Sequence, residues 1–405
     1  MEKRVVITGI NLMTAVGLDL KTSWDNLVAG KSGAGRITLF DASEHTTKIA
    51  AQLPDAFDDY ARSHCKKYLF KQMARSTKMC YVCTKGAVSN SGLNFEAFDK
   101  MRCAVIFGLV GTGYSSMDVQ RDPKHMIIKT MSNAMAAWVS IEYNLEGPSY
   151  TIATACSSAA YAIASGYDLI KSNKCDLVIV GGGSSGVNPD EIRGFNDLFA
   201  LSTRNDEPEK ASRPFSVDRD GFVMGEGAGI LILELEESAR ARGAEIHAEL
   251  LGYALTTEAY NIMSPQKDGV GMAATMELAL KNSGVNKEEV DYINAHGTST
   301  GLNDKYETMA VKRVFGDLAY KIPVSSAKSM IGHTISAAGG VEAVITIMSM
   351  KNNIMTPTIN YNPDPELDLD YVPDKAREKD IRIAISNSFA FGGHNALIKW
   401  NSNII

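Results

Sequence analysis

The sequence predicts an α/β protein built from two similar halves, and three observations carry this prediction. Short runs rich in Val, Ile and Leu alternate with stretches of helical periodicity along the chain, which is typical of stacked β-α units. The same alternation starts again after about residue 246. Finally, 405 residues with 45% hydrophobic composition are enough to bury a large two-part core.

In the first half we predict strands that alternate with helices, of which four strands and one helix are clear examples. The strands are apolar runs bounded by glycine or charged residues, and the helix is an alanine-rich stretch without proline. The predicted strands are 4–10, 102–108, 175–183 and 229–236, and the predicted helix is 157–173.

The second half repeats this alternation of strands and helices. We predict a strand at 247–255, a strand followed by a loop at 290–298, and helices at 271–284 and 339–353, the first of which ends at a glycine. A charged connector, 236–248, separates the two halves. We therefore expect two domains, residues 1–245 and residues 246–405. The proline-rich segment 355–374 reads as extended surface chain.

Composition and charge exclude several classes of protein. A net charge of −6 argues against a general nucleic-acid or anionic-membrane binder. No run reaches the roughly 18 apolar residues of a membrane span, and the N-terminus lacks the pattern of a signal peptide. Six cysteines in so long a chain fit free thiols in a reducing cytoplasm. We predict a cytoplasmic protein without nucleic-acid or membrane partners.

Two motif-like features are better explained by packing than by ligand binding. "GGGSSG" (181–186) satisfies a dinucleotide-binding pattern, but Pro189 stands where the phosphate-binding helix should already run. Cys80 and Cys83 form a C-x-x-C pair without a second pair or nearby histidines. We therefore predict no nucleotide, no metal and no enzyme-bound cofactor.

Cys156, in "TIATACSSAA", lies between a strand-like run and a helix-like run. The N-terminus of a helix favours a thiolate, so this is a suitable position for a nucleophile. A small residue is equally what a crowded strand-to-helix turn requires. Cys156 alone leaves both interpretations open.

Two of the seven histidines follow predicted strands and favour the nucleophile. His296 lies in "NAHGTST", and His333 lies five residues beyond Lys328 in "SSAKSMIGHT". A thiolate can attack a thioester, and imidazole N–H groups can hydrogen-bond a carbonyl that becomes an enolate. The glycine pair of "NSFAFGGHN" can expose backbone N–H groups as an oxyanion hole, beside a phenylalanine that gates the site.

Four ordered motifs resemble one family over essentially the whole chain. "TACSSA", "AHGTST", "SSAKSMIGH" and "NSFAFGG" resemble the condensing enzymes of the β-ketoacyl-acyl-carrier-protein synthase family, closest to the type II elongating enzymes. The resemblance implies a thiolase-like fold, a duplicated α-β-α-β-α five-layer sandwich. It also implies a decarboxylative condensation of malonyl-carrier protein with an acyl group held on Cys156, elongating fatty-acid or polyketide or polyene chains. Phosphopantetheine then belongs to the carrier-protein substrate.

The resemblance also implies a role for each matching residue. Cys156 takes the acyl group, His296 and His333 stabilise the enolate, and Lys328 orders this polar cluster. The backbone N–H groups of Cys156 and Phe391 form the oxyanion hole, and Phe391 with Gly392 forms the gate. Substrate and pantetheine contacts are expected from Thr298, Thr300, Val110, Met126 and Phe389. Asp304 and Glu307 are expected to have a structural role.

Several positions depart from the family pattern. The region 111–135 is several residues short, Val110 replaces a bulkier isoleucine, and Met126 lies near an aromatic position. Ala390 and His394 replace a glycine and a threonine of the gate loop, and a methyl group restricts backbone movement there. These changes lead to the hypothesis of a specialised-metabolism synthase.

The expected partners are an acyl carrier protein and a second ketosynthase-like subunit. Basic residues are candidates for docking the acidic carrier protein, namely Lys66, Lys67, Lys71, Arg121, Lys124 and Arg213. The second subunit is an identical copy or a chain-length-factor-like partner. Two alternatives remain, a non-catalytic chain-length-factor subunit and an acyltransferase or hydrolase that uses the cysteine without condensation.

Overall fold

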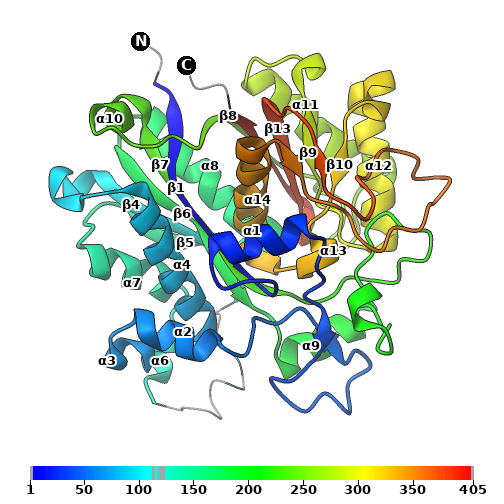
Figure 1. Ribbon diagram of the computed structural model, residues 1–405, viewed down its shortest axis with the longest axis horizontal. Helices are drawn as coiled ribbons and strands as arrows, with labels where there is room; N and C mark the ends of the chain where they lie inside the picture. The colour runs from blue at the N-terminus through cyan, green and yellow to red at the C-terminus, as the bar shows by residue number, and fades with distance from the viewer. Residues whose placement is uncertain (1–2, 112–114, 116, 118–123, 403–405) are drawn as a thin grey trace.

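One mixed sheet of ten strands runs through the part of the chain that the computed structural model describes, residues 3–111, 115, 117 and 124–402. Its order is β10-β9-β13-β14-β8-β1-β7-β6-β4-β5 (Figure 1). The strands of the first half are β1 Val5–Thr14, β4 Cys103–Gly108, β5 Ser149–Ile152, β6 Leu177–Ser185 and β7 Glu226–Leu235. Those of the second half are β8 Ala248–Thr257, β9 Tyr292–Asn294, β10 Val324–Ser325, β13 Ile383–Phe389 and β14 His394–Asn401. Two small separate pairs are β2 Gly35–Arg36 with β3 Ile49–Ala50, and β11 Ile354–Met355 with β12 Arg377–Glu378.

The two halves of the sheet pair their strands in the same pattern. β5, β4 and β6 are parallel neighbours, and β7 and β1 follow antiparallel. In the second half β10, β9 and β13 are parallel, and β14 and β8 follow antiparallel. The halves meet where β1 pairs with β8 over Val5–Ile7. The predicted α/β fold of two similar halves is confirmed, while the boundary at residues 245 and 246 stays a prediction.

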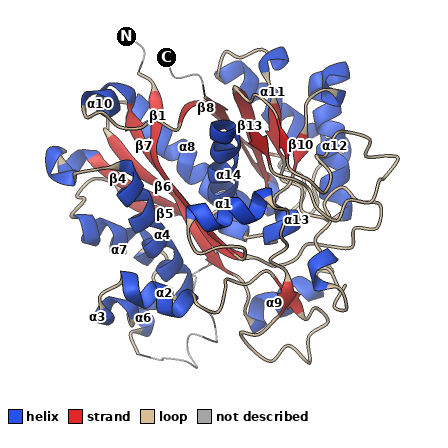
Figure 2. Cartoon of the chain, viewed as in Figure 1, coloured by secondary structure: helices blue, strands red, loops and turns tan. Residues whose placement is uncertain are grey.

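Helices cover both faces of the sheet and also fill the space between its halves (Figures 1 and 2). α4 and α7 pack on the outer face of the first half, α11 and α12 lie outside the second half, and α8 with α14 lies between the two. These are the five layers expected of the duplicated sandwich. The longer helices are α1 Leu20–Val28, α4 Arg75–Ser91, α7 Ala134–Tyr143, α8 Ser158–Lys171, α9 Pro189–Asp197, α11 Val270–Asn282, α12 Gly301–Phe315 and α14 Ala338–Asn352. The shorter ones are α2 Phe57–His64, α3 Lys67–Phe70, α6 Met126–Thr130, α10 Glu236–Ala241 and α13 Lys328–Ile331.

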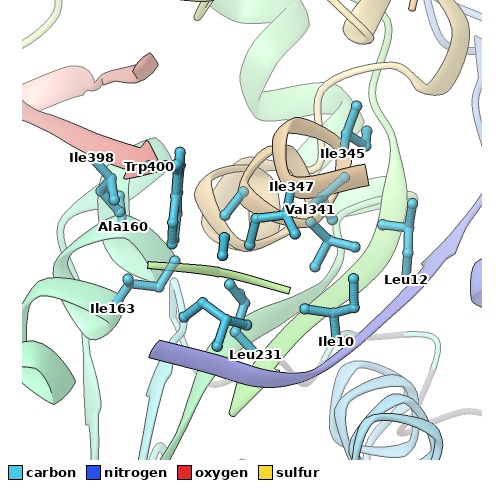
Figure 3. Packing of buried hydrophobic residues seen from close by; sticks show 14 of the residues in the cluster. Ile10, Leu12, Ala160, Ile163, Leu231, Val341, Ile345, Ile347, Ile398 and Trp400 are labelled. Carbon is cyan, nitrogen blue, oxygen red and sulfur yellow. The ribbon is translucent and has the colours of Figure 1, made fainter. Parts of the chain in front are cut away.

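The core centres on α14, which is buried along almost its whole length. A helix that is apolar all round belongs in the interior. In Figure 3, Val341 and Ile347 of α14 lie near Leu231 of β7 and Trp400 of β14. Backbones approach closely there, because a Cβ on Gly229 would lie 2.3 Å from the backbone nitrogen of Val341. The central layer therefore depends on a glycine at that contact.

The run 290–298, predicted as a strand followed by a loop, has this form in the structure. Its strand is β9, Tyr292–Asn294, and the chain beyond it is a loop. Among the described residues, no helix combines the length and the apolar character that crossing a bilayer requires.

Candidate active site

Cys156 lies in a short 3-10 turn, Ala155–Ser157, between β5 and α8. Ala155 has a left-handed backbone, with φ 49°. The Ser158 hydroxyl accepts the Thr154 N–H at 2.8 Å, and the Ser157 hydroxyl donates to the Thr154 carbonyl at 2.8 Å. These bonds fix the turn, so the small residues around Cys156 have a structural reason.

The Cys156 thiol is buried, and its surroundings act on its pKa in opposite directions. Burial raises the pKa from its ordinary value of about 9 to about 11. The positive charge of Lys328 and hydrogen bonds from the backbone N–H groups of Phe391 and Cys156 lower it by less. The expectation that the helix N-terminus favours the thiolate at rest is therefore outweighed by desolvation. The same two N–H groups face the sulfur, so they could donate to the carbonyl oxygen of an acyl group bound there.

His296 and His333 face each other beside this thiol. His296 follows β9, His333 follows α13, and their ring centroids are 5.3 Å apart with the planes nearly perpendicular. Burial, followed by the charge of Lys328, lowers the pKa of both imidazoles well below the ordinary value. Both rings are therefore neutral at pH 7, and each can donate one N–H or accept one proton.

Two buried carboxylates hold the loop that carries His296. Glu307 accepts the N–H groups of His296 and Gly297, both at 2.8 Å. Asp304 accepts the N–H groups of Thr298 and Ser299 at 3.0 and 3.1 Å. Both carboxylates come from α12, so the expected structural role of Asp304 and Glu307 agrees with these contacts.

Lys328 does not line the cavity but contacts the backbone of one of the histidines. Its ammonium group donates to the backbone oxygen of His296 at 2.7 Å and forms an ion pair with Glu342 of α14. Both side chains are 2% exposed. Burial raises the pKa of Glu342 to about 7, although the Lys328 charge opposes this shift.

Sequence reasoning missed Glu342. The signal was present, because Glu342 is the one ionisable residue inside the apolar run "GGVEAVITIM". A lone carboxylate on a buried helix needs a partner, and Lys328 is that partner.

The gate loop 390–393 closes the site from the side of β13 and β14. Gly392 has φ 81°, and its N–H donates to the Ile262 carbonyl at 2.7 Å. Ala390 has φ −124° and ψ 157°, which any residue adopts, so its methyl group causes no strain in this conformation. The His394 ring lies at Gly392 and makes an edge contact with Tyr161 of α8.

A cavity of about 500 Å³ joins these groups. It is lined by most of the predicted site residues, namely Cys156, His296, His333, Thr298, Thr300, Phe389 and Phe391. The Thr298 and Thr300 hydroxyls are hydrogen-bonded to each other at 2.9 Å. In the part of the chain that the structure describes, no group of three His, Cys, Asp or Glu side chains is placed to hold a metal ion.

Other predicted residues lie away from the cavity. Val110 and Met126 are exposed at 40% and 50% and do not line it. Four of the basic docking candidates are exposed, namely Lys66, Lys67, Lys71 and Lys124. Arg121 lies outside the described residues. Arg213 is 7% exposed, and its guanidinium group donates to Asp218 and to the Lys210 carbonyl. We therefore leave Arg213 out of any docking surface.

Family models match both halves of the sequence. Residues 2–239 match the Beta-ketoacyl synthase, N-terminal domain, and residues 247–362 match the Beta-ketoacyl synthase, C-terminal domain. The 3-oxoacyl-acyl-carrier-protein synthase 2 of Synechocystis is 41% identical over 411 residues, covering 98% of this chain and 97% of that protein. The enzyme of the same name from Coxiella burnetii is 41% identical over 414 residues, covering 98% of each.

Solved ketosynthase structures are similar over the whole length. One is a type II polyketide-synthase ketosynthase bound to its hexaketide and in complex with its acyl-carrier protein, with TM-score 0.88 and 29% identity. Another is the ishigamide ketosynthase/chain length factor, with TM-score 0.90 and 33% identity. Both similarities cover 100% of both chains, and they confirm the predicted thiolase-like fold. The chain belongs to the beta-ketoacyl synthase family.

Proposed function

We propose that this chain is an elongating β-ketoacyl-acyl-carrier-protein synthase whose nucleophile is Cys156. The observation that carries the proposal is the convergence of one buried thiol, two neutral imidazoles and two backbone N–H groups on a single cavity. The 3-oxoacyl-acyl-carrier-protein synthase 2 relatives support it. The site combines a nucleophile with hydrogen-bond donors for two oxyanions, which this reaction requires.

The first step moves an acyl group onto the enzyme. The Cys156 sulfur attacks the acyl thioester of the carrier, a new sulfur–carbonyl bond forms, and the bond to the carrier sulfur breaks. The proton of the thiol passes through a neutral imidazole to the departing carrier thiolate. N–H groups of Cys156 and Phe391 stabilise the negative oxygen of the tetrahedral intermediate.

The second step forms the carbon–carbon bond. Malonyl-carrier protein loses carbon dioxide, and imidazole N–H groups of His296 and His333 donate to the thioester oxygen of the resulting enolate. The enolate carbon attacks the acyl carbonyl on Cys156, and the cysteine leaves as a thiolate that takes up one proton from the buffered solvent, so each condensation consumes one proton. No base is needed, because decarboxylation creates the carbanion in place.

Other residues position these groups and the substrate. Lys328 acts as a positioning residue, since it holds the His296 backbone and carries the charge that helps to keep both imidazoles neutral. Thr298 and Thr300 line the path of the phosphopantetheine arm, which the carrier protein brings as part of the substrate. Phe391 and Gly392 form the gate, and Phe389 forms part of the wall.

Intact-mass measurement tests this assignment. We expect the chain to gain the mass of one acyl group when it is incubated with a carrier protein loaded with that acyl group. When malonyl-carrier protein is then added, the chain should lose this mass, and a 3-oxoacyl product should appear. Cys156→Ala is expected to give neither adduct nor product, whereas Cys175→Ala, at another buried cysteine, keeps both. An acyl adduct on Cys156→Ala would overturn the nucleophile assignment.

The class of acyl chain is a separate proposal. The two 3-oxoacyl-acyl-carrier-protein synthase 2 relatives are each 41% identical, whereas the type II polyketide-synthase ketosynthase and the ishigamide ketosynthase/chain length factor are 29% and 33% identical. We retain the hypothesis of polyketide or polyene intermediates on the departures at Ala390 and His394 of the gate loop, since Val110 does not line the cavity. If the chain turned over saturated and unsaturated acyl-carrier proteins at equal rates, this hypothesis would be rejected.

A second ketosynthase-like subunit is proposed to cover β5. This strand ends the sheet, and exposed apolar side chains surround it, including Tyr150, Ile141 and Ile127. An open strand edge beside an apolar surface is suited to pairing with another chain. Val110 and Met126 would then be covered as well. Whether the partner is an identical copy or a chain-length-factor-like subunit is decided by the mass of the chain expressed alone.

Three further expectations remain proposals. Docking of an acidic carrier protein by Lys66, Lys67, Lys71 and Lys124 is proposed from their charge. A cytoplasmic location is proposed because the described cysteines are free thiols. The division into residues 1–245 and 246–405 is proposed because Cys156 comes from one half and both histidines come from the other.

A further inference from the structure

Ile335 has a backbone conformation that its side chain disfavours. Its φ is 41°, in the left-handed region, where a β-branched side chain crowds its own backbone. Of the described residues with a left-handed backbone, only Ile335 and Val372 are β-branched. Glycine or asparagine would adopt the same turn with less strain, so the turn alone does not explain an isoleucine here.

The structure around this turn fixes it in place. Before the turn, the N–H of His333 donates to the Val223 carbonyl at 2.7 Å, and the His333 carbonyl accepts the N–H of Gly225 at 2.9 Å. Across the turn, the N–H of Ala337 donates to the Thr334 carbonyl at 2.9 Å. Backbone strain persists where the surroundings over-determine the conformation, and it gathers at functional sites. The reason for the isoleucine therefore lies in what its side chain contacts.

The Ile335 side chain forms part of the apolar wall beside Cys156. Ile335 is 5% exposed, lines the cavity and belongs to the same apolar cluster as Cys156. The turn that carries Cys156 packs against the 3-10 turn Ile335–Ala337. Besides Cys156, five cavity-lining residues belong to this cluster or pack against it, namely Phe195, Ala200, Phe222, Ile335 and Ala390. Of these five, only Ile335 has a left-handed backbone.

An acyl group on Cys156 would meet this wall with its first chain carbon. The backbone N–H groups of Cys156 and Phe391 face the sulfur and would hold the carbonyl oxygen. The imidazoles of His296 and His333 occupy the side from which the enolate comes. The carbon next to the carbonyl is thereby directed to the remaining, apolar side, where Ile335 lies. A β-branched side chain has few rotamers, so on a fixed backbone this part of the wall is rigid.

We propose that Ile335 is a specificity-determining residue, which admits acyl groups that are unbranched at the carbon next to the carbonyl and excludes those branched there. This inference rests on the proposed function and names the class of acyl group that the same site accepts. The extra methyl group of a 2-methylacyl chain needs the space that the rigid side chain occupies. One extra carbon in a hydrophobic pocket typically changes a rate by about 10–200-fold.

Three variants and a matched pair of donors test the proposal. Ile335→Gly removes this part of the wall and relieves the backbone, and Ile335→Val shortens the side chain by one carbon but keeps the β-branch. Val372→Gly is the control, because Val372 is also β-branched and left-handed, with φ 49°, and is 1% exposed, but does not line the cavity. The donors are octanoyl and 2-methyloctanoyl groups on the same bacterial fatty-acid carrier protein. Intact mass measures the rate at which each acyl group reaches Cys156.

We expect the wild type to accept octanoyl at least about tenfold faster than 2-methyloctanoyl. Ile335→Gly should reduce this preference about tenfold, Ile335→Val should reduce it by less, and Val372→Gly should keep it. The ratio of the two rates is unaffected by a uniform loss of folded protein, so it remains a test if a variant is partly unfolded. If Ile335→Gly does not fold at all, the preference of Ile335→Val carries the test.

Three results would overturn the proposal. The first is a wild type without any preference between the two donors. The second is a wild-type preference that is retained in the Ile335 variants. The third is an equal change in Val372→Gly, since the ratio would then respond to the fold in general and not to the wall of the cavity.

A thiol probe separates this inference from the proposed function. If the wild type takes no acyl group from the carrier, the proposed function fails, but n-butyl and sec-butyl methanethiosulfonate can still probe the wall. Each transfers its alkylthio group to the cysteine sulfur with loss of methanesulfinate, and the sec-butyl branch then lies two atoms from that sulfur, as in a 2-methylacyl group. The rate ratio at Cys156, with Cys156→Ala as the blank, is divided by the ratio for N-acetylcysteine. A fall of about tenfold in this value from wild type to Ile335→Gly, with no change in Val372→Gly, supports the proposal, and an unchanged value in Ile335→Gly overturns it.

Discussion

Lys328 and Glu342 form an ion pair in the interior, and the same lysine donates to the backbone oxygen of His296 at 2.7 Å. Each side chain is 2% exposed. Burying two charges is costly, and their attraction offsets that cost only if both remain. The pair therefore links the central helix α14 to the loop that positions a histidine of the site.

Removing either partner should destabilise the protein, but unequally. Glu342→Leu leaves a buried ammonium group unpaired, and we expect a loss of about 3–5 kcal/mol in the free energy of unfolding. Lys328→Met is expected to lose less, because Glu342 already has a pKa of about 7 and becomes neutral by binding a proton. Urea unfolding of both variants and the double variant measures this. A larger loss for Lys328→Met than for Glu342→Leu would contradict the raised pKa of Glu342.

The pH dependence of stability follows from the same carboxyl group. Burial raises the pKa of Glu342 from 4.5 to about 7, so the folded state binds this proton more tightly than the unfolded state. Its stabilising contribution is fully present below about pH 4.5 and is lost as the pH rises through about 7. We expect the stability of wild type relative to Glu342→Gln to fall over that window, measured by urea midpoints. A relative gain with rising pH would reverse the sign and reject the account.

The sequence predicted the elements that apolar periodicity decides, but not the contacts that distant side chains make. β6, β7, α8 and α14 lie close to their predicted ranges, because each is set by its own pattern. The loop after the strand at 290–294 was predicted, but not its cause, which is that the carboxylates of Asp304 and Glu307 accept N–H groups of the residues after Ala295. The residues of this loop do not by themselves reveal which carboxylates will bind them.

The site was predictable where motifs carry it, and less so where tertiary packing carries it. Cys156, His296 and His333 do line one cavity. The resting charge of Cys156 was misjudged, because a helix N-terminus is local whereas desolvation depends on the whole fold. Arg213 resembled a surface charge, yet the fold pairs it with Asp218. The exposure of Phe199, at 93%, was not predicted, since an apolar residue in a sequence is first assigned to the core.

Alkylation of Cys156 should report its raised pKa. Iodoacetamide reacts with the thiolate, so the rate at Cys156 is expected to keep rising with pH toward about 11. At pH 8 the thiolate fraction is then about a hundredfold below that of an unperturbed cysteine. Rates read by mass, with Cys156→Ala as the blank and N-acetylcysteine as the reference, test this. A plateau near pH 8 would mean that Lys328 and the N–H groups outweigh burial.

Replacing either histidine should separate the two half-reactions. His296→Ala and His333→Ala each remove a donor to the enolate oxygen, so decarboxylation of malonyl-carrier protein should fall about 10²–10³-fold. Acyl transfer to Cys156 should fall less, since the oxyanion donors of that step are backbone groups and the remaining imidazole can still carry the thiol proton. Because the pKa of both imidazoles lies well below 6.5, wild-type decarboxylation should not decline between pH 8 and 6. Release of carbon dioxide measures both expectations, and a decline near pH 6.5 would contradict the neutral pair.

The gate glycine Gly392 should tolerate no side chain. Its φ is 81°, and a Cβ there would lie 2.9 Å from Cδ2 of His394. The backbone cost alone, about 1–2 kcal/mol, corresponds to a factor of about 5–30 in the population of this loop conformation.

We expect Gly392→Ala to slow acyl transfer from the carrier by at least that factor. Adding His394→Ala should recover part of the loss, because it removes the steric contact and leaves the backbone strain. Gly194→Ala is the matched control and should retain the wild-type rate, because a Cβ at this position of α9 would meet no atom within 4 Å beyond the backbone of its own helix. Full recovery in the double variant would show that the contact with His394, rather than the left-handed backbone, is what reserves this position for glycine.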